Sequence, residues 1–189
     1  MGKNISKEKM EEYKKTIKGK FDEKEIKHMY KLFHKAAPTG KMGKKEFKKY
    51  IEDLAIFKKV DSQESYDQLF RGYDRDADGT ITFKEYLEYH LGIVFSEPDE
   101  LFDIVFSMYD ADGNGYITRD ELIEVVTNST RWMGDCDVES KDVQDLIQAE
   151  VDKIVIFADV NKDGQISKEE LYAAYEKHPE ILEKLKNLA

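Results

Sequence analysis

The chain has 189 residues, of which 40 are acidic and 30 are basic, and its formal net charge is −10. This balance argues against nucleic-acid binding, because the lysines also lack interleaved aromatic residues on which bases could stack. The single cysteine, Cys136, excludes an internal disulfide bond. No apolar run approaches the roughly 18 residues that a membrane-spanning helix needs, and no secretory segment is evident, so we expect a cytoplasmic protein.

The chain begins with MGKNIS, which fits the myristoylation pattern Met-Gly-x-x-x-Ser with Gly2 as the acylated residue. One myristoyl group binds membranes only weakly and needs a second signal. Residues 1–59 hold 18 lysines against 9 acidic residues, whereas residues 60–189 hold 12 basic against 31 acidic residues. A basic first third favours anionic lipid, so we expect peripheral membrane association. The alternative is that these lysines are only the solvent-facing sides of two helices.

Residues 35–46 (KAAPTGKMGKKE) are a defective copy of a 12-residue pattern that three later segments carry in full. The glycine at position 6 and the glutamate at position 12 are retained. Position 1 is Lys35, whose ammonium stands where a bound cation needs a carboxylate, and position 3 is Ala37, which has no side-chain oxygen. Pro38 at position 4 stiffens the turn. We expect this loop to hold no metal and to act as the structural partner of residues 74–85.

The three complete copies are residues 74–85, 110–121 and 159–170. Side-chain oxygens stand at positions 1, 3 and 5, followed by glycine at 6, isoleucine at 8, a hydroxyl at 9 and glutamate at 12. This is the EF-hand pattern, which wraps about six to eight oxygens around one Ca²⁺, including the carbonyl of position 7 and a water held at position 9. Bidentate closure by the glutamate favours Ca²⁺ over Mg²⁺, which remains a possible competitor. The predicted ligands are Asp74, Asp76, Asp78, Thr80, Thr82 and Glu85, then Asp110, Asp112, Asn114, Tyr116, Thr118 and Glu121, then Asp159, Asn161, Asp163, Gln165, Ser167 and Glu170.

Helices are expected on both sides of every loop, which predicts an all-α fold of four EF-hands in two paired lobes. The position-8 residues of paired loops should form short β contacts. The N-terminal lobe, 1–95, would hold the degenerate loop and the loop at 74–85. The C-terminal lobe, 96–189, would hold the other two loops and a final helix.

A broken first loop with a Pro-x-Gly turn, followed by three complete loops, resembles the neuronal calcium sensor family of recoverin-like proteins. The resemblance covers nearly the whole chain, including MGKNIS, FDEKEIKHMYKLF at 21–33, AAPTG at 36–40 and HPEILEKL at 178–185. It implies a calcium sensor with an acylated N-terminus. It also implies an apolar surface that holds either the protein's own acyl chain or a target helix.

A sensor must expose an apolar surface when calcium binds, whereas a calcium buffer need not. Apolar residues of the first lobe recur at helical three-to-four spacing and are placed to line a groove for an amphipathic target helix. The alternative is that this stripe is simply core. The predicted groove residues are Met29, Phe33, Phe47, Ile51, Leu54, Phe57, Phe70, Phe83, Tyr86 and Leu87.

We expect a calcium sensor that regulates a target protein at a membrane. We do not expect an enzyme, because the sequence contains no recognisable phosphate-binding glycine loop, zinc-type Cys/His cluster or nucleophile with a base. A soluble calcium buffer of the sarcoplasmic type remains an alternative. A calcium-triggered photoprotein is a weaker one, because the chain has one tryptophan and four histidines. After Pro179, the apolar residues Ile181, Leu182, Leu185 and Leu188 form a stripe. That stripe would either pack on the second lobe or occupy the groove.

Overall fold

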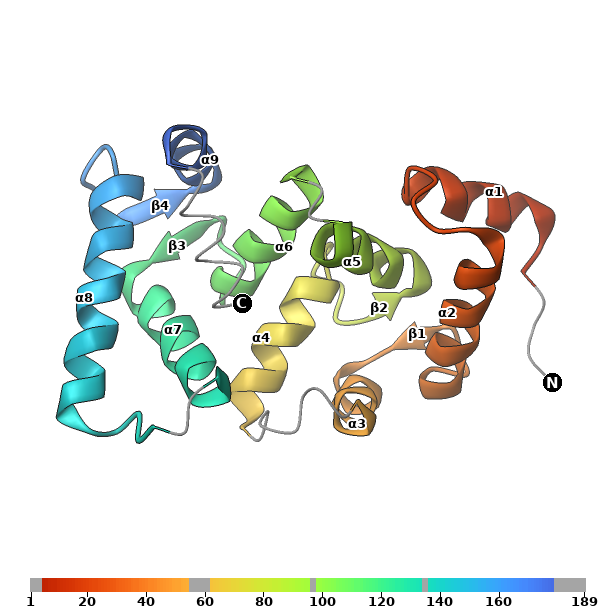
Figure 1. Ribbon diagram of the computed structural model, residues 1–189, viewed down its shortest axis with the longest axis horizontal. Helices are drawn as coiled ribbons and strands as arrows, with labels where there is room; N and C mark the ends of the chain where they lie inside the picture. The colour runs from red at the N-terminus through yellow and green to blue at the C-terminus, as the bar shows by residue number, and fades with distance from the viewer. Residues whose placement is uncertain (1–4, 55–61, 96–97, 134–135, 179–189) are drawn as a thin grey trace. The chain divides into compact units, whose positions relative to one another are not determined.

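The computed structural model describes residues 5–54, 62–95, 98–133 and 136–178. Helices dominate this part of the chain (Figure 1), which confirms the predicted all-α fold. No helix in the described part of the chain combines the length and hydropathy that crossing a bilayer requires. In chain order the elements are α1 (Lys7–Thr16), α2 (Glu23–Ala36), β1 (Lys41–Met42), α3 (Lys44–Asp53), α4 (Gln63–Tyr73), β2 (Ile81–Thr82), α5 (Phe83–Phe95), α6 (Pro98–Tyr109), β3 (Tyr116–Thr118), α7 (Arg119–Met133), α8 (Lys141–Ala158), β4 (Gln165–Ser167) and α9 (Lys168–Lys177).

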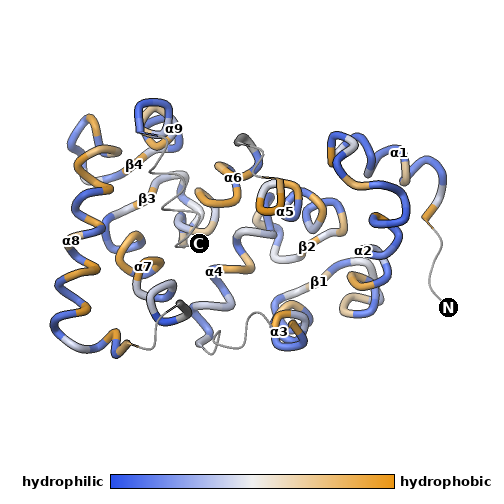
Figure 2. Tube along the Cα trace, in the orientation of Figure 1, coloured by the Kyte–Doolittle hydropathy of each residue, from blue (hydrophilic) through white to orange (hydrophobic). Residues whose placement is uncertain are grey.

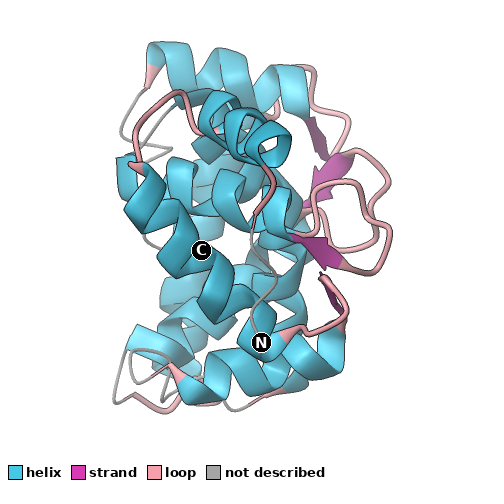
Figure 3. Ribbon diagram, turned by 90° about the vertical axis from the view of Figure 1, so that its right-hand side faces the viewer, coloured by secondary structure: helices cyan, strands magenta, loops and turns pink. Residues whose placement is uncertain are grey.

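The short strands pair the loops two by two, as predicted (Figure 3). Strand β1 is antiparallel to β2 and places Met42 opposite Ile81. Strand β3 is antiparallel to β4 and places Ile117 opposite Ile166. All four of these position-8 side chains are buried, so the defective loop contributes to its pair in the same way as a complete one.

The chain folds as two compact units, Met1–Lys58 with Tyr73–Ile104, and Lys59–Gly72 with Val105–Ala189. These units do not coincide with the predicted lobes 1–95 and 96–189, because most of α4 belongs to the second unit. Its buried polar side chains explain this assignment. Gln68 Oε1 accepts a hydrogen bond from Asn128 Nδ2 on α7 at 3.0 Å, and Arg71 Nη2 donates to the carbonyl of Met108 at 3.1 Å.

Helix α1 contributes to the core of the first unit although it precedes the first EF-hand, whose loop is residues 35–46. Met10, Tyr13 and Ile17 follow one another at three- and four-residue spacing and are all buried. Figure 2 shows such apolar positions alternating with hydrophilic ones along the helices. A helix with one apolar face of this kind is stabilised chiefly by packing that face against its neighbours. Here the neighbours are α2 and α5.

An aromatic cluster fills the centre of the first unit, around Phe83 at the start of α5. Its ring centroid lies 4.9 Å from that of Tyr13, 4.9 Å from that of Tyr30 and 5.5 Å from that of Phe33, in edge-to-face contacts. Such contacts contribute about 0.5–1.5 kcal/mol each beyond area burial. Helices α1 and α2 therefore pack against Phe83, the first residue of α5, which is the helix that follows the loop at 74–85.

Gly92 marks a close approach of α5 to α6 within the first unit. A Cβ at this position would lie 2.5 Å from Ile104 Cδ1 and 3.1 Å from the backbone of Glu100 and Leu101. We expect Gly92→Ala to lower the free energy of unfolding by about 1–3 kcal/mol, as measured by urea denaturation. Gly92→Ala combined with Ile104→Val should recover part of this loss, because valine lacks the Cδ1 atom. An alanine variant at least as stable as the parent would contradict this packing, because the higher helix propensity of alanine alone would raise the stability.

His90 makes the stability of the first unit sensitive to pH. Burial lowers the pKa of His90 below its usual 6.5, against the hydrogen bond that Nδ1 makes to the carbonyl of Tyr86 at 2.7 Å. The unfolded chain therefore takes up a proton near pH 6.5 while the folded protein remains neutral at His90. The free energy of unfolding should decrease as the pH falls through about 6.5.

Urea denaturation with a calcium chelator present, at pH 7.5 and at pH 5.5, measures this effect of His90. The difference in stability between the two pH values should be smaller in His90→Gln than in the parent. An equal difference in both proteins would show that this imidazole does not contribute.

Candidate calcium sites

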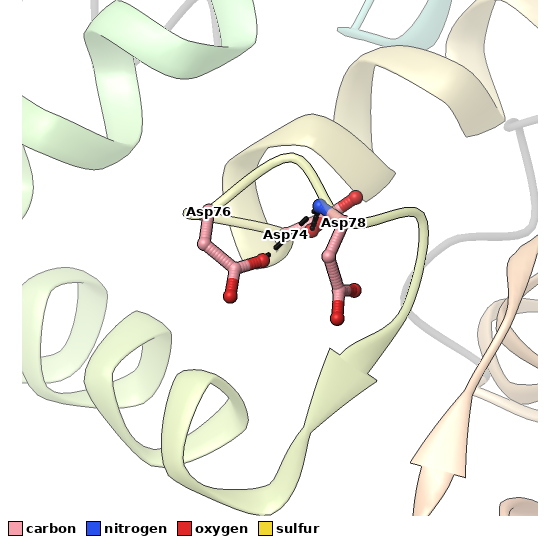
Figure 4. Close-up of side chains that lie close together, drawn as sticks. All are labelled: Asp74, Asp76 and Asp78. Atoms are coloured by element: carbon pink, nitrogen blue, oxygen red, sulfur yellow. Dashed lines mark hydrogen bonds between the residues drawn. The ribbon is translucent and has the colours of Figure 1, made fainter.

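The loop at 74–85 gathers three carboxylates on one side of a tight turn (Figure 4). The carboxylate oxygens of Asp74, Asp76 and Asp78 approach within 4.8 Å of one another. Asp74 is buried and accepts two backbone hydrogen bonds, from the N–H of Asp78 at 3.1 Å and from that of Gly79 at 3.0 Å. Asp78 accepts the N–H of Thr80 at 2.8 Å. The backbone amides thus hold these side chains in a fixed geometry.

The same hydrogen bonds recur in the second complete loop. Asp110 accepts the N–H groups of Asn114 and Gly115, at 3.0 and 2.9 Å. Its carboxylate, with those of Asp112 and Glu121, forms a second group of oxygens within 4.8 Å. The predicted ligands at positions 1, 3 and 12 are therefore already together in this loop.

In the third complete loop Asp159 accepts the N–H groups of Asp163 and Gly164, at 3.2 and 3.1 Å. Asn161 Oδ1 accepts the N–H of Asp163 at 2.8 Å, so position 3 has the same orientation as in the other loops. Among the described residues, however, the three carboxylates of this loop do not form a group as close as those of the first two. The amide oxygen stands at position 3 in this loop and at position 5 in the second loop, and both loops have three carboxylates among their predicted ligands.

The glutamate at position 12 joins each loop to the helix that follows it. Glu85 Oε2 accepts both the N–H and the hydroxyl of Thr82, at 2.8 and 2.7 Å, and Oε1 accepts the N–H of Arg75 at 3.1 Å. Thr82 Oγ1 in turn accepts the N–H of Glu85 at 3.3 Å. This reciprocal arrangement is a capping box. It recurs at Thr118 with Glu121 and at Ser167 with Glu170.

The position-9 hydroxyls therefore have a role that the sequence interpretation did not assign to them. Thr82, Thr118 and Ser167 were predicted to hold a water beside the metal. In the structure each donates to the glutamate three residues later and caps the exiting helix. The sequence could have predicted this role, because Ser/Thr-x-x-Glu at the start of a helix is the capping-box pattern.

Position 4 adopts a left-handed backbone conformation in all three complete loops. The φ angles are +54° at Ala77, +71° at Gly113 and +60° at Lys162. The proline ring fixes φ near −65°, so Pro38 at position 4 of the first loop is excluded from this conformation. The first loop thus differs from the others in its backbone path as well as in its ligands. The exiting helix α3 begins at Lys44, and its N-cap residue, Gly43, provides no side-chain cap.

The donor set of the complete loops suits Ca²⁺, a hard cation that binds oxygen and accepts flexible coordination. Burial raises the pKa of Asp74 and of Asp110, the position-1 carboxylates of two loops, although backbone hydrogen bonds oppose the change. Hydrogen bonds from the backbone and hydroxyl of Ser167 lower the pKa of Glu170.

An ion pair crosses from the defective loop at 35–46 to the loop at 74–85. Lys41 Nζ lies 3.0 Å from Asp78 Oδ2. The hydroxyl of Thr80 and then this ammonium lower the pKa of Asp78. The sequence interpretation missed Lys41, because its role depends on the antiparallel register that places it opposite Thr82.

Most of the predicted groove residues lie in the core. Met29 and Leu54 are partly exposed, and Phe57 lies outside the described residues. Phe70 belongs to the second unit and the others to the first. A groove lined by these side chains stays a prediction, because it requires a different packing. The buried members are Phe33, Phe47, Ile51, Phe70, Phe83, Tyr86 and Leu87, each with at most 4% of its surface exposed.

Two further predictions, acylation at Gly2 and the C-terminal apolar stripe at 181–188, fall outside the described residues. The N-cap of α1 is Ser6, four residues after Gly2, and Ser6 Oγ accepts the N–H of Lys9 at 3.3 Å. Cys136 is exposed and forms no disulfide bond.

Comparison with known proteins agrees with this geometry. Residues 38–90 and 99–176 each match a family model described as an EF-hand domain pair. Neuronal calcium sensor 1 of Lymnaea stagnalis is 32% identical over 186 residues, which cover 98% of this chain and 96% of that protein. Guanylyl cyclase-activating protein 2 of Lithobates pipiens is 30% identical over 175 residues, or 90% of this chain and 82% of the relative.

Other alignments are shorter. Recoverin of Homo sapiens is 34% identical over 83 residues, which cover 44% of this chain and 40% of that protein. The alignments with S-modulin of Aquarana catesbeiana and calcium-binding protein NCSA of Dictyostelium discoideum likewise span 39% and 34% of those relatives. The alignment that runs through both EF-hand pairs and nearly the whole of both chains decides the assignment: the protein belongs to the neuronal calcium sensor family.

Proposed function

We propose that the protein binds Ca²⁺ at its three complete loops and converts binding into helix movement that regulates a target protein at a membrane. The capping box at position 12 is the observation that carries this proposal. Glu85 is a predicted ligand and also holds the start of α5 through Thr82. To give both oxygens to a bound Ca²⁺, Glu85 must change these hydrogen bonds, so α5 responds to loading.

Movement of α5 would reach α1 through the aromatic cluster. Phe83 stands two residues before Glu85, and its ring packs edge-to-face on Tyr13 at 4.9 Å. Buried aromatic contacts of this kind are replaced rather than stretched when a helix rotates, because packed cores are bistable. Helix α1 follows the predicted acylation site Gly2 by only a few residues. Calcium loading and the position of an acyl group are therefore mechanically linked in this proposal.

A target would bind where the core of the first unit opens. The buried groove residues offer an apolar face suited to an amphipathic helix of a partner protein. Guanylyl cyclase-activating protein 2, one of the relatives, carries in its name the regulation of a partner enzyme. We infer a regulatory role of this general kind for the present chain, with a partner recognised through its apolar helix face.

Liposome sedimentation of the myristoylated protein tests the membrane part of the proposal. With vesicles containing phosphatidylserine, more protein should pellet in Ca²⁺ than in chelator, and Gly2→Ala should abolish the difference. Equal pelleting in both conditions would retain anchoring and reject the switch. No pelleting in either condition would reject the membrane role.

Fluorescence of an apolar-surface dye separates a sensor from a soluble calcium buffer. Dye binding should increase on Ca²⁺ addition, because the sensor proposal requires the buried residues around Phe83 to become accessible. A protein that takes up Ca²⁺ without any increase in dye fluorescence would be a buffer.

A further inference from the structure

The metal-free first hand places a positive charge on its partner's calcium site. Lys41 stands at position 7 of the defective loop, and the β1–β2 register sets it opposite Thr82. Its Nζ atom lies 3.0 Å from Asp78 Oδ2, and both side chains are substantially exposed, at 58% and 38%. The ammonium is also within the electrostatic influence of Asp76 and Glu85, which raise the pKa of Lys41 after Asp78 does. One predicted ligand of this site, Asp78, is thus ion-paired with a lysine of the neighbouring loop.

The other two complete loops show a different arrangement. The position-7 residues there are Tyr116 and Gln165, which are neutral, and they pair across β3–β4 with Ser167 and Thr118. In the part of the chain that the structure describes, no ion pair is made to a ligand of either loop. A cation supplied by the neighbouring loop is therefore particular to the loop at 74–85.

We propose that Lys41 is a tethered cation through which the metal-free hand lowers the Ca²⁺ affinity of the site at 74–85. This inference rests on the proposed calcium binding and deepens it, by assigning the defective loop a role in tuning its partner. The partner of Lys41 is the position-5 ligand Asp78, which a bound ion needs directly.

The ammonium of Lys41 opposes calcium loading through both states of the loop. Without metal, four carboxylates repel one another, and the ammonium of Lys41 relieves part of that repulsion. With metal, the same ammonium either leaves Asp78 or remains beside a dication. Both outcomes make loading less favourable than it would be for the four carboxylates alone. The site with the most carboxylates therefore need not be the tightest of the three.

The expected size of the effect follows from the exposure of the pair. Solvent screens an exposed ion pair, so removing one is expected to change an affinity by only about 1.4- to 5-fold. Lys41→Met should therefore raise the affinity of this site by about 1.4- to 5-fold. Lys41→Glu should raise it further, because it adds a negative charge. The gain should diminish at high ionic strength, where the charges are screened.

NMR spectroscopy of the full-length chain in calcium–chelator buffers resolves the three sites. The amides of Gly79, Gly115 and Gly164 each donate to the position-1 aspartate of their own loop and report its occupancy. In Lys41→Met the midpoint at Gly79 should move to lower free Ca²⁺, while the midpoints at the other two glycines stay unchanged. Lys45→Met is the matched control, because it removes an equal charge from an exposed position on α3.

Failure of this inference is distinguishable from failure of the proposed function. If Gly79 responds to Ca²⁺ with the same midpoint in Lys41→Met and Lys45→Met, the tethered-cation role is wrong and calcium sensing stands. If both variants shift all three glycines equally, the effect is one of net charge and the inference is again wrong. If Gly79 does not respond in the parent protein, calcium binding at this loop fails as well.

Discussion

Replacing Glu85 by glutamine is expected to weaken Ca²⁺ binding at the loop 74–85 by about 100-fold, equivalent to about 2.7 kcal/mol. The carboxylate is buried and accepts three hydrogen bonds, from the backbone of Arg75 and from the backbone and hydroxyl of Thr82. Glutamine has one oxygen and no charge, so it cannot close a site with two oxygens or satisfy both groups of donors. Isothermal titration calorimetry should show the number of tight sites falling from three to two.

Glu46→Gln is the matched control for this substitution. Glu46 occupies position 12 of the defective loop and is exposed, so its replacement should leave all three sites unchanged. Near-UV circular dichroism should also show that calcium no longer perturbs the tyrosines around α5 in Glu85→Gln. Parent-like affinity in that variant would mean that Glu85 does not close the site.

Replacing Ala77 by proline is expected to abolish calcium binding at the same loop without removing any ligand. Ala77 has φ +54°, and proline cannot adopt that angle. Proline also restricts Asp76, because the residue before a proline is pushed towards an extended conformation. The three aspartates would no longer converge, and we expect a loss of affinity of more than about 100-fold. Calorimetry would again count two sites.

Ala77→Gly separates the backbone effect from the loss of the alanine side chain. Glycine adopts left-handed angles without steric cost, whereas an L-residue there costs about 1–2 kcal/mol. The glycine variant should therefore bind Ca²⁺ at least as well as the parent. Conversely, Pro38→Gly should not give a fourth site, because Lys35 and Ala37 still provide no ligands. A proline variant that still binds three ions would show that position 4 tolerates another conformation.

The calcium loops and their pairing could be predicted from the sequence because each rule is local. Six positions of a 12-residue window specify the turn, and position 8 specifies the partner strand, so Met42 opposite Ile81 followed from spacing alone. That the loop at 35–46 holds no metal stays a prediction, made from Lys35 and Ala37. The left-handed angle at Ala77, which adds Pro38 to that explanation, required coordinates because alanine rarely adopts it.

Features that depend on contacts between distant segments could not be predicted from the sequence. Helix α4 joins the second unit through Gln68 and Asn128, which are 60 residues apart and both buried. In the sequence Lys41 is one of many lysines in a basic segment, and only the strand register shows that it lies beside Asp78. The apolar stripe at Phe33 and Phe83 fits either a core or a groove, and periodicity cannot separate the two, since both require the same spacing.

A heteronuclear NMR titration of the full-length chain with Ca²⁺ tests most directly whether three loops bind metal and move helices. The amides of Gly79, Gly115 and Gly164 should respond over three equivalents. The amides of Tyr13 on α1 and of its C-cap residue Ile17 lie outside every loop and should shift along with Gly79. A response at fewer than three glycines, or one confined to the loops while α1 remains unchanged, would contradict the proposed coupling.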